Sequence, residues 1–226
     1  MMIVCANSKG GVGKSTIAAH LSVWLSEQGF RTALLDCDKQ RSSSQWIAEV
    51  EAQIAIRASS DPEECLLIAR ELAASHDFVV ADAPGGLEDI SRTLLILADF
   101  AVFPISPSIL DIRSVVDATK VLRYAQTIRG GKPEGRLVFN KMKTRGKGSR
   151  QLVEEAPSLG CPVALNVIRD LQAYVEAPLQ GTVVSRLGRP GASAAKDIAR
   201  LFVELFGETI ARMRTEQHEE RKVENG

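Results

Sequence analysis

Residues 8–16 read SKGGVGKST and follow directly on a short apolar run, residues 2–6. Three glycines let such a loop curl so that its backbone N–H groups converge on a phosphate chain, and a helix that follows adds its positive N-terminal end. Lys14 can then reach the β- and γ-phosphates of a nucleotide, while the Ser15 hydroxyl binds Mg²⁺. The stretch predicts a phosphate-binding loop between a strand and a helix.

The loop departs from the generic pattern in one position. GxxxxGK followed by Ser or Thr requires a glycine where this chain has Ser8. A glycine-rich strand-to-helix turn without a ligand is the alternative interpretation. Three glycines, a lysine and a hydroxyl in one strand–loop–helix context favour nucleotide binding over that alternative.

Further apolar runs predict the fold. Near-continuous apolarity is typical of strands buried on both faces of a parallel sheet, and segments with helical spacing lie between the runs. We therefore expect an α/β fold: a doubly wound, mostly parallel sheet with helices on both faces and a ligand at the carboxyl ends of the strands. Residues 1–214 are expected to form one domain, and the polar residues 215–226 to fray. The predicted strands are residues 2–6, 32–35, 78–81, 100–104, 136–139 and 162–167.

Composition narrows the classes of function. Of the 226 residues, 45% are hydrophobic and 25% are charged, as in ordinary globular proteins. The 28 basic and 28 acidic side chains balance, so the net charge gives no sign of a nucleic-acid or membrane partner. No apolar run approaches the ~18 residues of a membrane-spanning helix, and the N-terminus lacks the basic leader of a signal peptide. The four cysteines include no CxxC pair, which favours reduced thiols in a cytoplasmic protein.

Four motifs carry a family resemblance. The loop contains an additional lysine, Lys9, and DCDKQ (residues 36–40) is similar to a DxDPQ element with Lys39 in place of proline. DAPGG (residues 82–86) is similar to a Walker-B and switch segment, and PISPSILD (residues 104–111) to a PxxPSxLD step. On these motifs the chain resembles the deviant Walker-A P-loop NTPases of the ParA/MinD group, closest to the small ParA-type ATPases.

The resemblance implies roles for charged side chains around the loop. Lys9 would reach across an ATP-sandwich dimer to the partner subunit's phosphates, and Asp38 would position the attacking water. Asp82 would bind Mg²⁺ through water, with Asp36 as a supporting carboxylate. An aspartate that ends a buried strand is costly without a cation or donors, although capping the next helix is the alternative for each. Lys9, Lys14 and Asp38 are thus the predicted catalytic residues, and Ser15, Asp36 and Asp82 the predicted metal ligands.

Asn140 follows a predicted strand, where an amide offers both a donor and an acceptor to an adenine edge, as in members of the family. An asparagine in an ordinary turn is an equally good interpretation. The predicted nucleotide-binding residues are Lys9, Gly10, Gly11, Val12, Gly13, Lys14, Ser15, Thr16 and Asn140.

Basic residues gather after Asn140 in a stretch without acidic side chains. A solvated loop is the usual meaning of such a run, whereas the resemblance favours a surface for non-specific DNA. Basic residues nearer the C-terminus are further candidates, although Arg169 could instead form an ion pair. The predicted DNA-binding residues are Lys141, Lys143, Arg145, Lys147, Arg150, Arg169, Arg186 and Arg189.

Together the resemblance implies a slow ATPase that requires ATP and Mg²⁺, forms a homodimer, binds nucleoid DNA and is stimulated by a ParB-like adaptor protein. Its cargo would be a plasmid, a chromosome region or a protein cluster. A MinD-like membrane regulator is disfavoured because residues 212–222 carry acids throughout and no apolar face. A DNA-transfer factor of the VirC class and a metabolic ATPase or ligase of the same fold remain alternatives.

Overall fold

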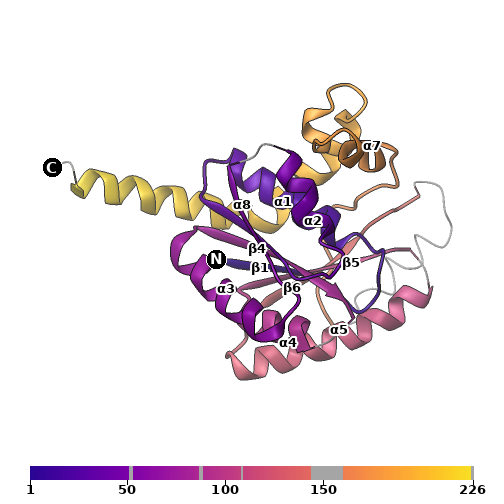
Figure 1. Ribbon diagram of the computed structural model, residues 1–226, viewed down its shortest axis with the longest axis horizontal. Coiled ribbons are helices and arrows are strands. Elements are labelled where there is room, and N and C mark those ends of the chain that lie inside the picture. The colour runs from indigo at the N-terminus through magenta and orange to yellow at the C-terminus, as the bar shows by residue number, and fades with distance from the viewer. Residues whose placement is uncertain (51–52, 87–88, 108, 144–159, 225–226) are drawn as a thin grey trace.

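The computed structural model describes residues 1–50, 53–86, 89–107, 109–143 and 160–224. Six strands form one parallel sheet in the order β3-β2-β4-β1-β5-β6, with helices on both faces (Figure 1). This confirms the predicted α/β fold. The strands are β1 Met2–Asn7, β2 Thr32–Asp36, β3 Ile54–Ala58, β4 Phe78–Gly85, β5 Phe100–Ile105 and β6 Glu134–Phe139.

The helices divide between two apolar cores, one on each side of the sheet. Ile3 of β1 faces the core that α1, α2 and α8 cover, whereas the next residue, Val4, faces the core under α3, α4 and α5. Strands with two buried faces need apolar residues at every position, which explains their near-continuous apolarity. The helices are α1 Lys14–Glu27, α2 Ser42–Glu49, α3 Pro62–Ser75, α4 Asp89–Leu97, α5 Ile109–Ile128, α7 Ala173–Leu179 and α8 Ala192–Glu224, with a short 3₁₀ turn, η2, at Val184–Arg186.

Two strand predictions need correction. β3 has no counterpart among the predicted strands because it is an edge strand, where exposed Arg57 and partly exposed neighbours interrupt the apolar run. Residues 162–167 were predicted as a strand but form only a single bridge, Leu137 to Val163. Strand pairing with β6 does not continue past this bridge, because the N–H groups of Leu165 and Asn166 donate to the Glu204 carboxylate at 2.6 and 2.8 Å.

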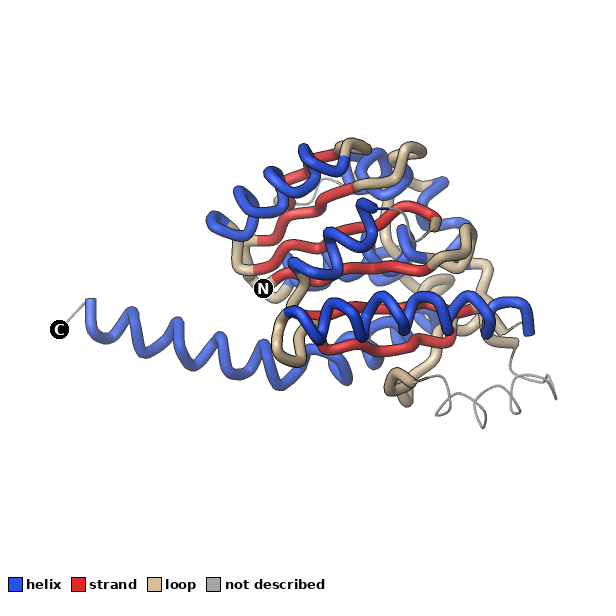
Figure 2. The backbone as a smooth tube through the Cα atoms, turned by 90° about the horizontal axis from the view of Figure 1, so that it is seen from below, coloured by secondary structure: helices blue, strands red, loops and turns tan. Residues whose placement is uncertain are grey.

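The C-terminal end also differs from expectation. α8 continues to Glu224, although the sequence predicted fraying from Thr215. Arg214 donates to the Gln28 side chain at 2.8 Å, and Arg212 lies one helical turn from Glu216, 4.0 Å away. Beyond these contacts the helix extends away from the sheet (Figure 2). Within the described part of the chain, no helix has the length and apolarity to cross a membrane.

Candidate functional site

The phosphate loop, residues 8–13, connects the end of β1 to the start of α1. Gly11 and Gly13 have φ values of 74° and 99°, in the left-handed region that glycine adopts without a steric cost. Gly13 is also the N-cap of α1 and has no side chain with which to cap the helix. The first N–H groups of α1 are therefore left for an anion, which the helix dipole favours.

Two asparagines, one at the end of β1 and one directly after β6, hold this loop. Asn7 Nδ2 donates to the Pro104 carbonyl at 2.6 Å, and Asn7 Oδ1 accepts from the Lys9 N–H at 3.0 Å. Asn140 Nδ2 donates to the Val12 carbonyl at 2.8 Å. Asn140 thus contacts the loop itself in this structure, and its contact with an adenine edge stays a prediction. Asn7 was not among the predicted site residues because it precedes the loop pattern, which begins at Ser8, and belongs to none of the other motifs.

Lys14 lies beneath the loop with only 6% of its surface exposed. Its Nζ donates to the Lys9 carbonyl at 3.3 Å. Burial lowers the pKa of Lys14, while the charges of Asp82, Asp38 and Cys5 act in the opposite direction. A buried ammonium group at the base of a glycine loop is placed to meet phosphate oxygens.

Asp82 lies at the same end of the sheet, next to Cys5 of β1 in register. It is fully buried, and neither carboxylate oxygen has a hydrogen-bond partner among the described residues. Burial raises the pKa of Asp82 to about 7; the nearby Ser15 and Ser43 hydroxyls act against this shift. An orphaned buried carboxylate beside two hydroxyls fits Mg²⁺ and its bound waters, so Asp82 and Ser15 are the residues that would hold the ion. The Ser43 hydroxyl likewise has no hydrogen-bond partner among the described residues, and it lies in a run of serines, residues 42–44, that fits no motif.

Asp36 differs from Asp82 because both of its oxygens have backbone partners. Oδ1 accepts from the Asp38 N–H at 3.1 Å, and Oδ2 accepts from the Ser44 N–H at 2.9 Å in the first turn of α2. In this structure Asp36 therefore caps α2, which was the alternative to the predicted metal-binding role. Among the described residues, no group of three His, Cys, Asp or Glu side chains is arranged to hold a metal. A magnesium ion here would thus depend on phosphate oxygens and water, as is usual for Mg²⁺.

The buried Asp82 carboxyl predicts a pH-dependent stability. Its pKa in the folded protein, about 7, lies above the ordinary aspartate value of 3.8, so between these values the folded state binds more protons than the unfolded state. The free energy of unfolding should therefore fall as the pH rises from about 4 to 7. Asp82→Asn should raise it by roughly 1–3 kcal/mol at pH 8 and by less at pH 5, as measured by urea unfolding without metal or nucleotide. An effect of equal size at both pH values would contradict this origin.

Asp38 lies at the rim of a cavity of about 280 Å³ beside the phosphate loop, together with Gly10, Lys14 and Gly85. Its Oδ1 accepts from the Gln40 N–H at 2.9 Å, and its Oδ2 accepts from the Gly85 N–H at 3.3 Å. Asp38 therefore links the loop after β2 to the end of β4. The predicted catalytic residues Lys9, Lys14 and Asp38 follow the carboxyl ends of β1 and β2, which lie on either side of β4 in the sheet.

Three of the predicted DNA-binding residues that the structure describes have polar partners within the protein. Lys141 Nζ donates to the Gly11 carbonyl at 2.8 Å and so lies at the phosphate loop. Arg169 pairs with Asp197 through two bonds of 2.7 and 2.8 Å, and Arg186 pairs with Glu27 at 3.0 Å. Lys143 and Arg189 are exposed. Arg145, Lys147 and Arg150 lie outside the described residues.

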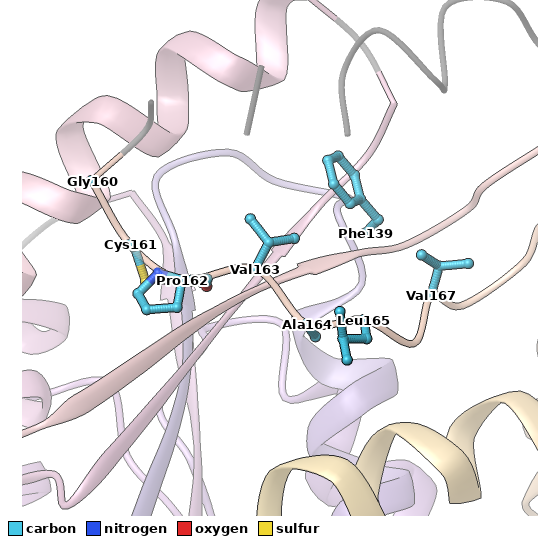
Figure 3. Close-up of a pocket in the computed structure, with 8 residues that line it drawn as sticks. All are labelled: Phe139, Gly160, Cys161, Pro162, Val163, Ala164, Leu165 and Val167. Carbon is cyan, nitrogen blue, oxygen red and sulfur yellow. Dashed lines mark hydrogen bonds between the residues drawn. The ribbon is translucent and has the colours of Figure 1, made fainter. Parts of the chain in front are cut away.

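A second hollow lies beside the last strand of the sheet. Figure 3 shows apolar side chains around it, including Phe139 of β6, Val163 and Leu165, and its volume is about 580 Å³. No charged side chain lines it within the described residues. It therefore lacks the donors that a phosphate group requires, and the cavity at the phosphate loop is the better candidate for a nucleotide.

Comparison with known proteins is consistent with this site. The family model described as "CobQ/CobB/MinD/ParA nucleotide binding domain" matches residues 3–216. The maintenance of carboxysome distribution protein A of Halothiobacillus neapolitanus is 32% identical over 213 residues, which cover 90% of this chain and 95% of that protein. An ATP complex of a McdA variant from Cyanothece has a TM-score of 0.73 at 17% identity, covering 90% of this chain and 95% of the other. MinD of Pyrococcus horikoshii, complexed with Mg-ADP, has a TM-score of 0.69 at 21% identity, covering 91% and 97%.

Proposed function

Because the chain belongs to the CobQ/CobB/MinD/ParA family of nucleotide-binding domains, as its motifs predicted, we propose that it is a ParA-type ATPase that positions a cargo. The observation that carries the proposal is the orphaned Asp82 carboxylate beside buried Lys14, under a loop with free helix N–H groups. A buried, unpaired carboxylate is costly, and a phosphate-bound cation would remove that cost.

Each side chain of the site has a distinct part in the proposed hydrolysis of ATP. The loop N–H groups and the Lys14 ammonium bind and orient the β- and γ-phosphates. Asp82 and the Ser15 hydroxyl are the residues that would hold Mg²⁺, and the bound ion would supply positive charge next to the phosphate oxygens. Asp38, at the open rim of the cavity, orients the attacking water toward the γ-phosphate. Positioning and charge neutralisation are the main contributions of proteins to phosphoryl transfer, so this set is sufficient.

The proposal includes a homodimer that encloses ATP. Lys9 is exposed at the loop, and its carbonyl oxygen rather than its ammonium group contacts Lys14. An exposed cation at the rim of the site is suited to the phosphates of a nucleotide bound by the partner subunit. Two such lysines would neutralise charge across the dimer only when both sites contain ATP.

Lys9→Ala is expected to weaken ATP-dependent dimerisation at least tenfold and to leave ADP binding by the monomer within about threefold. The reason is that the Lys9 ammonium group would make a charge-assisted contact of about 1.5–3 kcal/mol across the interface, whereas the loop N–H groups and Lys14 would bind ADP within the subunit. Sedimentation with each nucleotide measures both effects. Lys120→Ala removes a comparably exposed lysine on α5 as a control. Equal losses for ATP-dependent dimerisation and ADP binding would place Lys9 in its own subunit's site.

We assign the cargo by similarity. The Halothiobacillus relative is named for the maintenance of carboxysome distribution, which favours a protein assembly over a plasmid as the cargo of this chain. An adaptor protein on that cargo would stimulate hydrolysis, and non-specific DNA of the nucleoid would serve as the surface for movement. Among the predicted DNA-binding residues that the structure describes, Lys143 and Arg189 are exposed, and we expect them to make phosphate contacts. Arg169 and Arg186 have acidic partners, so we expect them to contribute less.

DNA binding is expected only with ATP, because dimerisation doubles the number of phosphate contacts made by one rigid body. Each phosphate neutralised adds about −0.9 to the slope of log affinity against log salt concentration. Lys143→Ala with Arg189→Ala should therefore flatten that slope, whereas Lys120→Ala should not. The measurement is an anisotropy titration with unrelated duplexes in ATP and in ADP. Equal affinity in both nucleotides, or strong dependence on DNA sequence, would contradict the positioning ATPase.

A further inference from the structure

Two consecutive residues after β6 bind two consecutive carbonyl groups of the phosphate loop. Asn140 Nδ2 donates to the Val12 carbonyl, and Lys141 Nζ donates to the Gly11 carbonyl, each at 2.8 Å. The pairs are separated by 128 and 130 residues in the sequence. Two residues that are distant in the sequence thus hold the middle of the phosphate loop.

These contacts determine how the loop presents its donors. A trans peptide unit is planar, so its C=O and N–H groups point in opposite directions. When Lys141 holds the Gly11 carbonyl, the N–H group of Val12 points away from Lys141. When Asn140 holds the Val12 carbonyl, the N–H group of Gly13 points away from Asn140. Two donors of the loop are therefore oriented before any phosphate binds.

The backbone around Lys141 is built for this contact. Lys141 has a φ of 57°, in the left-handed region that side chains other than glycine rarely adopt, and disfavoured backbone conformations persist where surrounding contacts enforce them. Its N–H donates to Asn140 Oδ1 at 2.9 Å, while the Asn140 N–H donates to the Ile105 carbonyl of β5 at 2.8 Å. Asn140 is 4% exposed, so the turn is anchored on buried structure.

Gly13 of the phosphate loop lies against the Asn140 side chain. A Cβ atom on Gly13 would collide with Asn140 Nδ2, so this position requires glycine for space as well as for its φ of 99°. The sequence predicted Lys141 as part of a DNA-binding run, whereas in the structure its ammonium group donates to the phosphate loop. The geometry gives it a role in the nucleotide site.

We propose that Lys141 is a nucleotide-positioning residue, which together with Asn140 holds the phosphate loop in its binding conformation before the nucleotide arrives. The inference rests on the proposed binding of nucleotide by this loop. Preorganisation raises affinity because the loop loses less conformational freedom when the ligand binds. The ammonium charge beside the loop also favours the phosphate chain.

The test uses Lys141→Met, which keeps the length of the side chain and removes the donor, and Lys141→Arg, which keeps a charged donor. Lys120→Met is the matched control on an exposed lysine of α5. Titration with fluorescent Mg·ADP should show about five- to twentyfold weaker binding for Lys141→Met. Lys141→Arg should stay within about threefold of the unchanged protein, and Lys120→Met should be unaffected.

A second measurement needs no ligand. Hydrogen–deuterium exchange of the nucleotide-free protein should be faster at residues 9–13 in Lys141→Met and unchanged in the two other variants. Unchanged affinity and unchanged exchange in Lys141→Met would overturn the positioning role. If that variant lost only DNA affinity, Lys141 would belong to a DNA surface instead. If the unchanged protein did not bind nucleotide, the proposed function itself would be wrong. This result differs from the one that would overturn only the role of Lys141.

Discussion

Lys14→Ala should weaken binding of Mg·ATP by about 10²–10⁴-fold and remove measurable hydrolysis. The buried ammonium group lies under the glycine loop, where two charge-assisted hydrogen bonds to phosphate oxygens would contribute about 1.5–3 kcal/mol each. Alanine also leaves the negative charges of Asp82 and Asp38 without this nearby cation, so bound phosphates would be repelled. Calorimetric titration and a phosphate-release assay measure the two effects.

Two controls keep this result interpretable. Circular dichroism should show an unchanged fold, because Lys14 is the first residue of α1 and packs against loop backbone rather than in the apolar core. Lys120→Ala should leave binding and hydrolysis unchanged. Hydrolysis retained by Lys14→Ala would mean that the phosphate site lies elsewhere, and the site assignment would then be wrong.

The fold was predictable from sequence where burial leaves a periodic signal. Strands between two apolar cores show continuous apolar runs, so five of the six strands were found. Four of the predictions end within two residues of the observed bounds, whereas for β4 only the first half, residues 78–81, was predicted. β3 was missed because exposed Arg57 and partly exposed neighbours interrupt its apolar run. Residues 162–167 were misassigned because their apolar run does not reveal that Glu204, 38 residues further on, binds two of their N–H groups.

The site shows the same limit at the level of single side chains. The phosphate loop was predictable from the spacing of its glycines and lysine, and Asp82 from its position at the end of an apolar run. The partner of a charged side chain was not: Arg186 meets Glu27, which lies 159 residues away, and Lys141 meets Gly11. Equally, nothing in DCDKQ distinguishes Asp36, which caps α2, from Asp38, which faces the cavity. Such pairings arise only when segments that are distant in the sequence meet in the folded protein.

Asp38→Ala is expected to separate nucleotide binding from turnover. Asp38 lies at the cavity rim and contacts the Gln40 and Gly85 N–H groups, whereas the phosphate loop, Lys14 and Asp82 keep their own contacts without it. Affinity for Mg·ATP should therefore stay within about threefold. Hydrolysis should fall by about 10²–10⁴-fold, the usual contribution of a group that positions or deprotonates the attacking nucleophile. Equilibrium binding and single-turnover hydrolysis measure these two quantities independently.

The slower turnover has a consequence for assembly. If ATP closes the dimer and hydrolysis opens it, a variant that binds but does not hydrolyse ATP should accumulate as the dimer, and sedimentation in ATP should show this state persisting while the unchanged protein returns to monomer. Asp117→Ala removes an exposed carboxylate of α5 that pairs with Lys120, and this variant should behave like the unchanged protein. Should Asp38→Ala instead fail to bind nucleotide, Asp38 would be a metal ligand or a structural residue. The carboxylate that orients water would then have to be sought elsewhere around the cavity.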